Sequence, residues 1–181
     1  MSLLRQWLPL ALPVGVLVVG MATYSDPSQP TPRRLPTVAA APKPRYTRAP
    51  DPSSSRCSET PQLADALLLQ GQRLGIRIIS GPPELAGKDA SYRAEHGRLG
   101  TIVLKPRPMS AVVRCKLISH EFIHVLQHLN GQLKGVETLG WGATSHVRQR
   151  HPIPQEAEAY QHQDQAGYVL QLLRATPKPS L

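Results

Sequence analysis

The sequence has no dense cluster of basic residues in the part that could form a globular domain, although its formal net charge is +9. Residues 1–56 carry seven Lys or Arg against two acidic residues, whereas residues 57–181 carry fourteen against ten. The excess positive charge therefore belongs largely to the N-terminal arm. A nucleic-acid-binding protein would show a basic patch on a recognisable fold. Because this sequence shows neither, we expect no nucleic-acid partner and interpret the arm as a solvated linker.

The sequence also lacks internal repeats, and it contains only two cysteines, Cys57 and Cys115. Its 181 residues suffice for one modest domain with appendages, for which we expect a monomer. Two cysteines in an exported domain favour a single disulfide. Such a bond would close a long loop and contribute about 4 kcal/mol by the chain-entropy argument. The alternative is two unrelated buried thiols.

An uncharged apolar run follows Arg5 and extends to Ala22. Its length lies between that of a signal-peptide core and that of a spanning helix. We therefore interpret residues 1–22 as a signal peptide or a single transmembrane anchor, which would contact the membrane if it is not cleaved. Arg33 and Arg34, which follow the apolar run, favour a cytoplasmic location for the rest of the chain. The cysteines favour the opposite, and we expect the domain to be exported or membrane-anchored on the periplasmic or extracellular side.

The next segment, residues 23–56, holds eight prolines among Ser, Thr, Ala and Arg. Proline fixes φ and removes a backbone donor, so neither a helix nor a sheet can run through it. The composition predicts an extended, disordered linker. Residues 57–175 would then form the domain, and residues 176–181 a flexible tail.

Apolar periodicity in the domain predicts the α+β fold class, with a short antiparallel sheet between helices. Pro106 and Pro108 would end the last strand, and Met109 would begin the helix that follows it. The expected elements are a helix at 58–74, a strand at 76–80, a hairpin of strands 90–95 and 100–105, a helix from 109, and a C-terminal helix from 154 through 173.

The helix from Met109 carries the motif His120-Glu121-Phe122-Ile123-His124. Histidines four residues apart lie on one face of a helix, about one turn apart, where two imidazoles can bind one metal ion. Glu121, next to the first ligand, can hold and deprotonate a metal-bound water. This pattern is the zinc metalloprotease signature. Alternatively, the two histidines are ordinary polar residues at the edge of a core.

A catalytic zinc site usually has three protein ligands. The metzincin extension needs Gly and His where this chain has Gln127 and Asn130, so that possibility is excluded. His128 continues the spacing of four, but three ligands from one helix cannot surround an ion. We interpret His128 as a neighbour of the site or a surface residue.

Acidic residues that could supply the third ligand follow Pro154, which marks a helix start. Glu156 and Glu158 both lie near the beginning of that helix, where acids suit the helix dipole. A carboxylate from this helix would complete a set of two histidines and one glutamate. Both residues could also be ordinary acids of a helix N-terminus.

The motif, followed some thirty residues later by a Glu-x-x-Ala helix, resembles the gluzincin group of zinc metallopeptidases, in particular its small bacterial minimal-domain members. In that group the ligand glutamate has Ala three residues on and a polar residue four on, which Glu156, Ala159 and Tyr160 match. The resemblance thus implies a zincin-like domain with Glu156 as third ligand and Glu158 as fallback. Many gluzincins have Asp or Asn at the position of Tyr160, which leaves open how a ligand histidine is oriented.

The resemblance implies that Zn²⁺ held by His120, His124 and Glu156 activates a water, with Glu121 as general base, to hydrolyse a peptide or protein substrate. The oxyanion needs a further donor. Tyr160 is our catalytic candidate, and His146, His151 and His162 are the others.

Two further features complete this picture of the site. Strand 100–105 could be an edge strand that pairs with an extended substrate. Residues 131–155, rich in glycine around Trp141, could form a mobile rim or lid.

Two other functions fit the same residues. One is a catalytically silent, membrane-tethered domain that binds zinc or a partner and does not need Glu121. The other is a structural module in which the motif is accidental. Metal content without proteolysis would favour the first, and absence of stoichiometric zinc the second.

Overall fold

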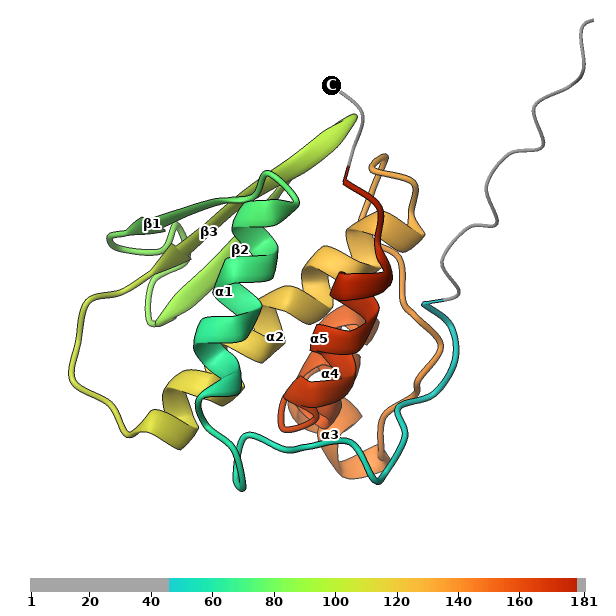
Figure 1. Ribbon diagram of the computed structural model, residues 1–181. Coiled ribbons are helices and arrows are strands. Elements are labelled where there is room, and N and C mark those ends of the chain that lie inside the picture. Colours follow the sequence, from blue (N-terminus) through green and yellow to red (C-terminus); the bar gives the residue numbers. More distant parts are fainter. Residues whose placement is uncertain (1–45, 179–181) are drawn as a thin grey trace, which may run out of the picture. The chain divides into compact units, whose positions relative to one another are not determined.

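The computed structural model describes residues 46–178, which form five helices and a three-stranded sheet (Figure 1). The fold class is α+β, as the sequence predicts. The signal peptide or anchor predicted at residues 1–22, residues 23–45 of the predicted linker and residues 179–181 of the predicted tail lie outside the described part of the chain. The elements are α1 (Leu63–Arg73), β1 (Arg77–Ser80), β2 (Ala90–Glu95), β3 (Arg98–Leu104), α2 (Ala111–Asn130), α3 (Ser145–Arg150), α4 (Pro154–His162) and α5 (Ala166–Ala175).

The sheet has the order β1-β3-β2, with β1 parallel and β2 antiparallel to β3. Two expectations are therefore wrong: the sheet is mixed, and the strand expected at 100–105 is central, not at an edge. Residues 99–103 of β3 are all buried, as suits a strand with a neighbouring strand on each side. The free edge nearest α2 is that of β2, which contacts this helix.

Helix α2 is the central element, in contact with the sheet, α1, α4 and α5 (Figure 1). Ser110 caps its start by accepting a hydrogen bond from the amide of Val113. All residues from Ile118 to His128 are buried, so the helix is covered all round rather than on one face. Any polar side chain in this stretch therefore needs a partner.

The long C-terminal helix expected from Pro154 is in fact two helices, α4 and α5, interrupted at residues 163–165. No Gly or Pro marks the break. Its cause is tertiary, because Asp164 accepts hydrogen bonds from the amide and hydroxyl of Ser58, and its carbonyl accepts from the amide of Cys57. The expected helix at 58–74 correspondingly begins only at Leu63.

Ordered packing extends beyond the expected domain limits at both ends. Tyr46, expected in the linker, is buried, and its hydroxyl hydrogen bonds to that of Thr176 at 3.0 Å. Ser55 likewise accepts a hydrogen bond from the amide of Gly167. Thr176 is itself buried and does not belong to a flexible tail. The folded part thus includes residues 46–56, which lie alongside α5.

The disulfide between Cys57 and Cys115 is present, as expected. It joins the segment before α1 to the second turn of α2, five residues before His120. Both cysteines are fully buried. The covalent bond therefore fixes the helix that carries the motif to the entry of the domain.

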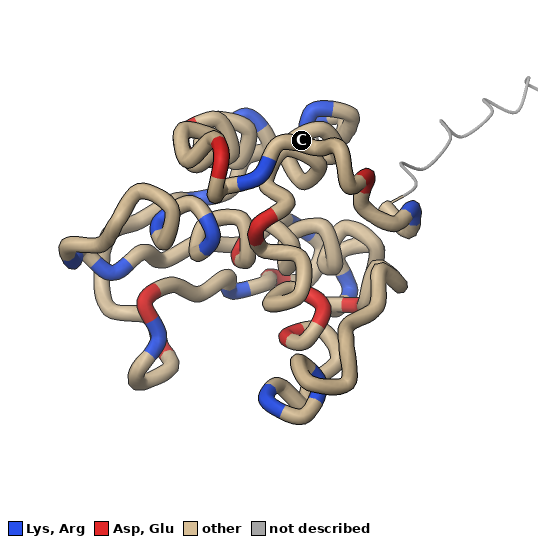
Figure 2. Tube along the Cα trace, turned by 90° about the horizontal axis from the view of Figure 1, so that it is seen from below, with Lys and Arg blue, Asp and Glu red and all other residues tan. Residues whose placement is uncertain are grey.

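Charges on the described residues are mixed, with Lys and Arg interspersed among Asp and Glu along the chain (Figure 2). Several form exposed ion pairs, such as Arg93 with Glu84 and Arg114 with Asp65. Pairs of this kind contribute little to stability. Within residues 46–178, no helix combines the length and apolar character that crossing a membrane requires.

Candidate metal centre

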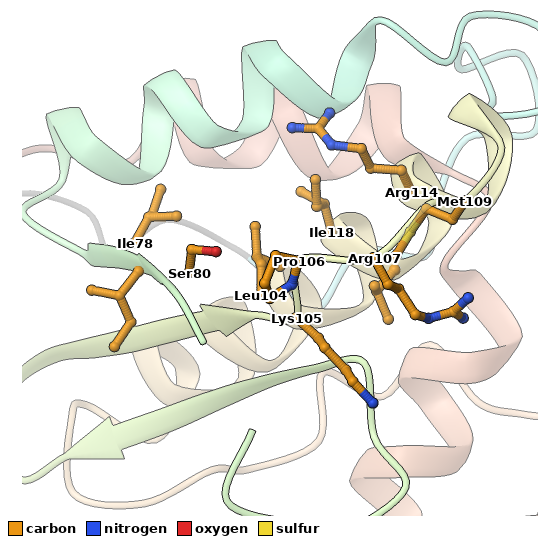
Figure 3. Close-up of a pocket in the computed structure, with 11 residues that line it drawn as sticks. Ile78, Ser80, Leu104, Lys105, Pro106, Arg107, Met109, Arg114 and Ile118 are labelled. Carbon is orange, nitrogen blue, oxygen red and sulfur yellow. The ribbon is translucent and has the colours of Figure 1, made fainter. Parts of the chain in front are cut away.

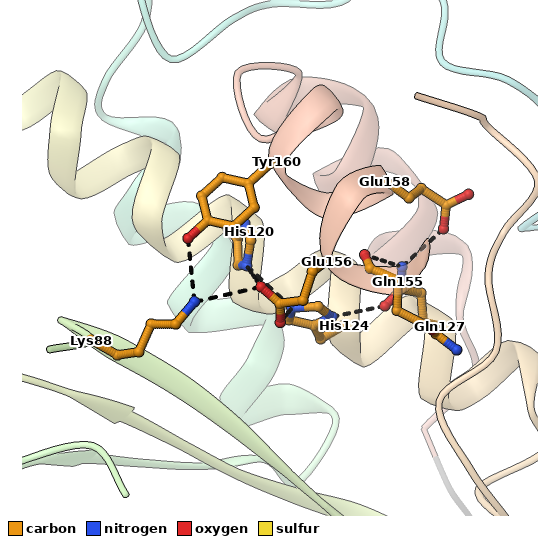
Figure 4. Close-up of polar contacts among 8 residues, drawn as sticks. All are labelled: Lys88, His120, His124, Gln127, Gln155, Glu156, Glu158 and Tyr160. Carbon is orange, nitrogen blue, oxygen red and sulfur yellow. Dashed lines mark hydrogen bonds and ion pairs between the residues drawn. The ribbon is translucent and has the colours of Figure 1, made fainter. Parts of the chain in front are cut away.

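Three side chains from two helices converge on one point (Figure 4). His120 and His124 extend from α2, and Glu156 extends from the first turn of α4. The two Nε2 atoms are 3.1 Å apart, and Glu156 lies 3.1 Å from His124 Nε2 and 3.6 Å from His120 Nε2. The structure therefore brings together the three residues expected as metal ligands.

The ligand atoms are close enough together for one metal ion, since one atom from each residue can be chosen with all three within 4.8 Å of one another. Ligand atoms about 2.0–2.1 Å from a tetrahedral zinc ion stand roughly 3.3 Å from one another. The two Nε2 atoms, and Glu156 Oε1 with His124 Nε2, are each 3.1 Å apart, whereas the 3.6 Å contact with His120 Nε2 comes from the other carboxylate oxygen, Oε2. In addition, Glu156 Oε2 is buried without a hydrogen-bond partner. Two imidazole nitrogens and one carboxylate are also a donor set that zinc accepts.

The electrostatics of the three residues are coupled. Contacts with His120 and His124 hold the pKa of Glu156 well below its usual range, so its carboxylate is ionised. Burial lowers the pKa of His120. Burial also acts to lower the pKa of His124, but contacts with Glu156, Glu121 and Gln127 outweigh it and raise that pKa. Metal binding requires an ionised carboxylate and two neutral imidazoles, so the raised pKa of His124 means that protons compete with a metal ion at that ring.

The two histidines differ in how their rings are held. His124 Nδ1 lies 2.7 Å from the side-chain oxygen of Gln127, whereas the buried Nδ1 of His120 has no hydrogen-bond partner. The ring of His120 instead packs edge-on against Tyr160, with centroids 4.5 Å apart. At position 160, where the gluzincin resemblance would lead one to expect Asp or Asn, His120 thus has an aromatic contact.

Glu121, the expected general base, is only 4% exposed. Burial raises its pKa to about 7, although His124 and a backbone hydrogen bond from Tyr92 oppose the shift. A carboxyl group with a pKa near neutrality can both accept and return a proton at physiological pH. Because Tyr92 belongs to β2, Glu121 also lies next to the free edge of the sheet.

Tyr160 lies beside the ligands, and Lys88 joins it from the opposite side of the site (Figure 4). Lys88 Nζ is 3.3 Å from the Tyr160 hydroxyl and 3.6 Å from Glu156 Oε2. His151 stacks on the other face of the Tyr160 ring, with centroids 3.6 Å apart. Sequence reasoning missed Lys88, because it precedes β2 in a loop and meets Tyr160 across 72 residues.

The remaining histidine candidates lie elsewhere. His162 hydrogen bonds to the carbonyl of Gly142 and the side chain of Gln165. His146 is exposed on α3. His128 is buried and hydrogen bonds through Nδ1 to the Tyr92 hydroxyl at 2.9 Å, so it is not a surface residue and does not join the ligand group.

Glu158, the fallback ligand, does not join the group either. It is 3% exposed and accepts hydrogen bonds from the amides of Leu139 and Trp141 and from Gln127. The segment expected as a lid is thereby fastened to α4. The contact of Gln127 with His124 was missed from the sequence, although the two residues are three apart on one helix, a spacing that brings side chains together.

Two hollows adjoin Glu156, of about 250 and 270 Å³. Both include Ile153, and the larger one reaches His124 and Tyr92. A separate hollow of about 400 Å³ lies between β1, the residues after β3 and the start of α2 (Figure 3). Its lining contains no acid or histidine.

Comparisons of this chain with protein-family models, curated proteins and solved structures found no match. The function is therefore argued from the site itself.

Proposed function

We propose that this protein is a zinc metallopeptidase of the gluzincin type, which hydrolyses peptide bonds in an extended peptide or protein substrate. The supporting observation is that His120, His124 and Glu156, a donor set that zinc accepts, bring one ligand atom each within 4.8 Å of one another. Glu121, a buried carboxyl group, follows His120 directly on the helix that carries both histidines. The zinc ion would supply a Lewis acid that acidifies water and polarises the scissile carbonyl.

Glu121 is the proton carrier of this proposal. Its carboxylate takes a proton from the attacking water and passes it to the nitrogen of the leaving amine. The pKa of about 7 suits both steps, because the group is partly ionised at neutral pH and readily releases the proton it has gained. A domain that only stores zinc would have no use for a buried acid at this position.

Lys88 and Tyr160 are the donors available to the oxyanion. The Tyr160 hydroxyl and the Lys88 ammonium lie together beside Glu156. Donors placed in advance where negative charge develops lower the barrier most in a site that excludes water. The Tyr160 ring is held between His120 and His151, which limits its movement.

The edge of β2 is the substrate strand in this proposal, in place of the strand expected at 100–105. β2 pairs only with β3 among the described residues, so its other edge is free. An extended peptide can add to such an edge through main-chain hydrogen bonds. The backbone contact of Tyr92 with Glu121 places this edge next to the proton carrier. The disulfide supports an exported location, where disulfides persist.

The experiment compares three variants for zinc content and for cleavage of an unstructured protein such as casein. Glu121→Gln is expected to retain zinc and lose cleavage, whereas His124→Ala loses both. Glu59→Gln, at an exposed glutamate, is the matched control and behaves like the wild type. Full turnover by Glu121→Gln would refute the mechanism. Stoichiometric zinc without cleavage of any substrate by the wild type would establish the silent zinc-binding domain instead.

A further inference from the structure

Glu158 is a buried carboxylate with three hydrogen-bond donors around it. Its Oε1 accepts from the amide of Trp141 at 2.8 Å. Its Oε2 accepts from the amide of Leu139 at 2.7 Å and from the side-chain nitrogen of Gln127 at 2.9 Å. Both carboxylate oxygens of Glu158 therefore act as acceptors, and all three partners point a donor at them.

The amide of Gln127 has only one consistent orientation. Its nitrogen donates to Glu158 and to the carbonyl of Gln155 at 3.0 Å, two groups that can only accept. Its oxygen must then face His124 Nδ1, 2.7 Å away (Figure 4). Because an amide oxygen only accepts, His124 Nδ1 carries a hydrogen. The lone pair of neutral His124 is thereby left on Nε2, the atom that faces Glu156.

The same carboxylate organises the chain segment that follows α2. Leu139 is fully buried and Trp141 nearly so, although neither belongs to a helix or strand. Two other side chains bind this segment independently: Gln155 donates to the carbonyl of Val136, and Asn130 to that of Thr138. Of these three side chains, only that of Glu158 also contacts the side chain of Gln127, which reaches His124.

We propose that Gln127 and Glu158 are positioning residues that couple metal binding at His124 to the ordering of residues 136–141. This inference rests on the proposed zinc site. A zinc ion bound at His124 Nε2 would fix the imidazole ring in the position from which Nδ1 donates to Gln127, 2.7 Å away. The Gln127 amide would in turn be fixed against Glu158, whose carboxylate binds the amides of Leu139 and Trp141. By linkage, the coupling acts equally in both directions.

The experiment uses the full chain and two glutamine variants of nearly unchanged volume. Gln127→Met removes the link to His124, whereas the matched control Gln155→Met removes only a side-chain bond to Val136. Zinc affinity is measured by competition with a chelator. Hydrogen exchange of the Leu139 and Trp141 amides is measured with and without zinc.

We expect Gln127→Met to bind zinc about 10–100-fold more weakly, the usual effect of losing a partner of a metal ligand. Zinc should slow exchange at Leu139 and Trp141 in the wild type and in Gln155→Met, but not in Gln127→Met. Equal zinc affinity of Gln127→Met and wild type, or equal losses in the two variants, would overturn the proposal.

Glu158→Gln covers the case in which Gln127→Met does not fold. The amide of Glu158→Gln keeps one acceptor oxygen but places a second donor against either Trp141 or Gln127. Zinc affinity should therefore fall at least threefold. An unchanged zinc affinity would overturn the proposal. The coupling and the peptidase function can fail separately. If the wild type cleaves substrate but Gln127→Met binds zinc as tightly as the wild type, the coupling alone is refuted. Weakened affinity in an enzyme without cleavage activity refutes the peptidase alone, and a wild type that binds no zinc refutes both.

Discussion

Glu156 Oε1 lies 3.1 Å from His124 Nε2, whereas the carboxylate of Glu158, two residues along the same helix, binds Leu139, Trp141 and Gln127 instead. Residues two apart on a helix point in directions about 200° apart. One glutamate therefore faces the two imidazoles of α2, and the other faces the segment after α2. The two acids cannot exchange roles without turning α4.

Metal analysis of two alanine variants tests this division. Glu156→Ala should lose stoichiometric zinc, because only two protein ligands remain. Glu158→Ala should retain all three ligands and bind zinc, but more weakly, and it should be less stable because the amides of Leu139 and Trp141 lose a buried acceptor. Zinc loss in Glu158→Ala with full zinc in Glu156→Ala would reverse the assignment.

The pH dependence of the metal-free protein should report on Glu121. Burial raises its folded pKa to about 7 from 4.5, so the folded state holds a proton that the unfolded chain releases between these values. Its contribution to stability is therefore present below pH 4.5 and is lost as pH rises through 7, with a ceiling of about 3 kcal/mol.

Glu121→Gln cannot release this proton. With a chelator present, urea unfolding at pH 5 and pH 8 should show a larger loss of stability in the wild type than in this variant, while Glu59→Gln follows the wild type. Parallel pH profiles for all three proteins would show that Glu121 is not held neutral by burial.

The parts of this structure that were predicted correctly carry local signals. One such signal is the spacing of His120 and His124 on a single helix. Another is Pro154, which marks the start of the helix that carries Glu156. The β2–β3 hairpin was likewise predicted, with Gly97 at φ +78° in its turn. Each of these signals lies within a few residues of the feature that it predicts.

The parts that were missed depend on contacts between distant residues. The parallel pairing of β1 with β3 joins Ile78 to Ile102, and nothing in either strand specifies it. The break between α4 and α5 follows from the bonds of Asp164 to Ser58. Lys88 reaches the site only because the loop before β2 passes Tyr160. In each case the determining partner is dozens of residues away.

The packing of α1 against α2 requires a glycine at position 71. A Cβ placed on Gly71 would lie 2.6 Å from the ring of Phe122, a fully buried side chain. Gly71→Ala should destabilise the protein by about 1–2 kcal/mol, because overpacking outweighs the higher helix propensity of alanine. Phe122→Leu makes room, so the double variant should be less destabilised than the sum of the two singles in urea unfolding. Strict additivity would contradict the contact.

The disulfide should contribute substantially to stability. Cys57 and Cys115 are separated by 58 residues, and a loop of that size corresponds to about 4 kcal/mol by the chain-entropy argument, with measured values often lower. A double Ala variant should therefore unfold at lower urea concentration by about 2–4 kcal/mol. The wild type should lose the same amount of stability in a reducing agent, whereas the stability of the double Ala variant should not depend on that agent. A variant as stable as the wild type would exclude a structural role for the bond.

Lys88 offers the sharpest separation of metal binding from catalysis. Its ammonium lies 3.6 Å from Glu156 Oε2 and 3.3 Å from the Tyr160 hydroxyl, so it repels a cation bound by Glu156 but attracts an oxyanion formed there. Lys88→Met should therefore bind zinc at least as tightly as the wild type while kcat falls about 100-fold, the effect of losing one oxyanion donor.

Lys88→Arg keeps the positive charge and should recover part of the lost kcat, because charge near the oxyanion is preserved even if its position changes. A residue that only supports the fold would lower zinc affinity and kcat together, and arginine would not restore kcat selectively. Parallel measurement of chelator competition and casein turnover for the two variants thus distinguishes the roles. Unchanged kcat in Lys88→Met would exclude Lys88 as the oxyanion donor and favour the Tyr160 hydroxyl, which Lys88 contacts at 3.3 Å.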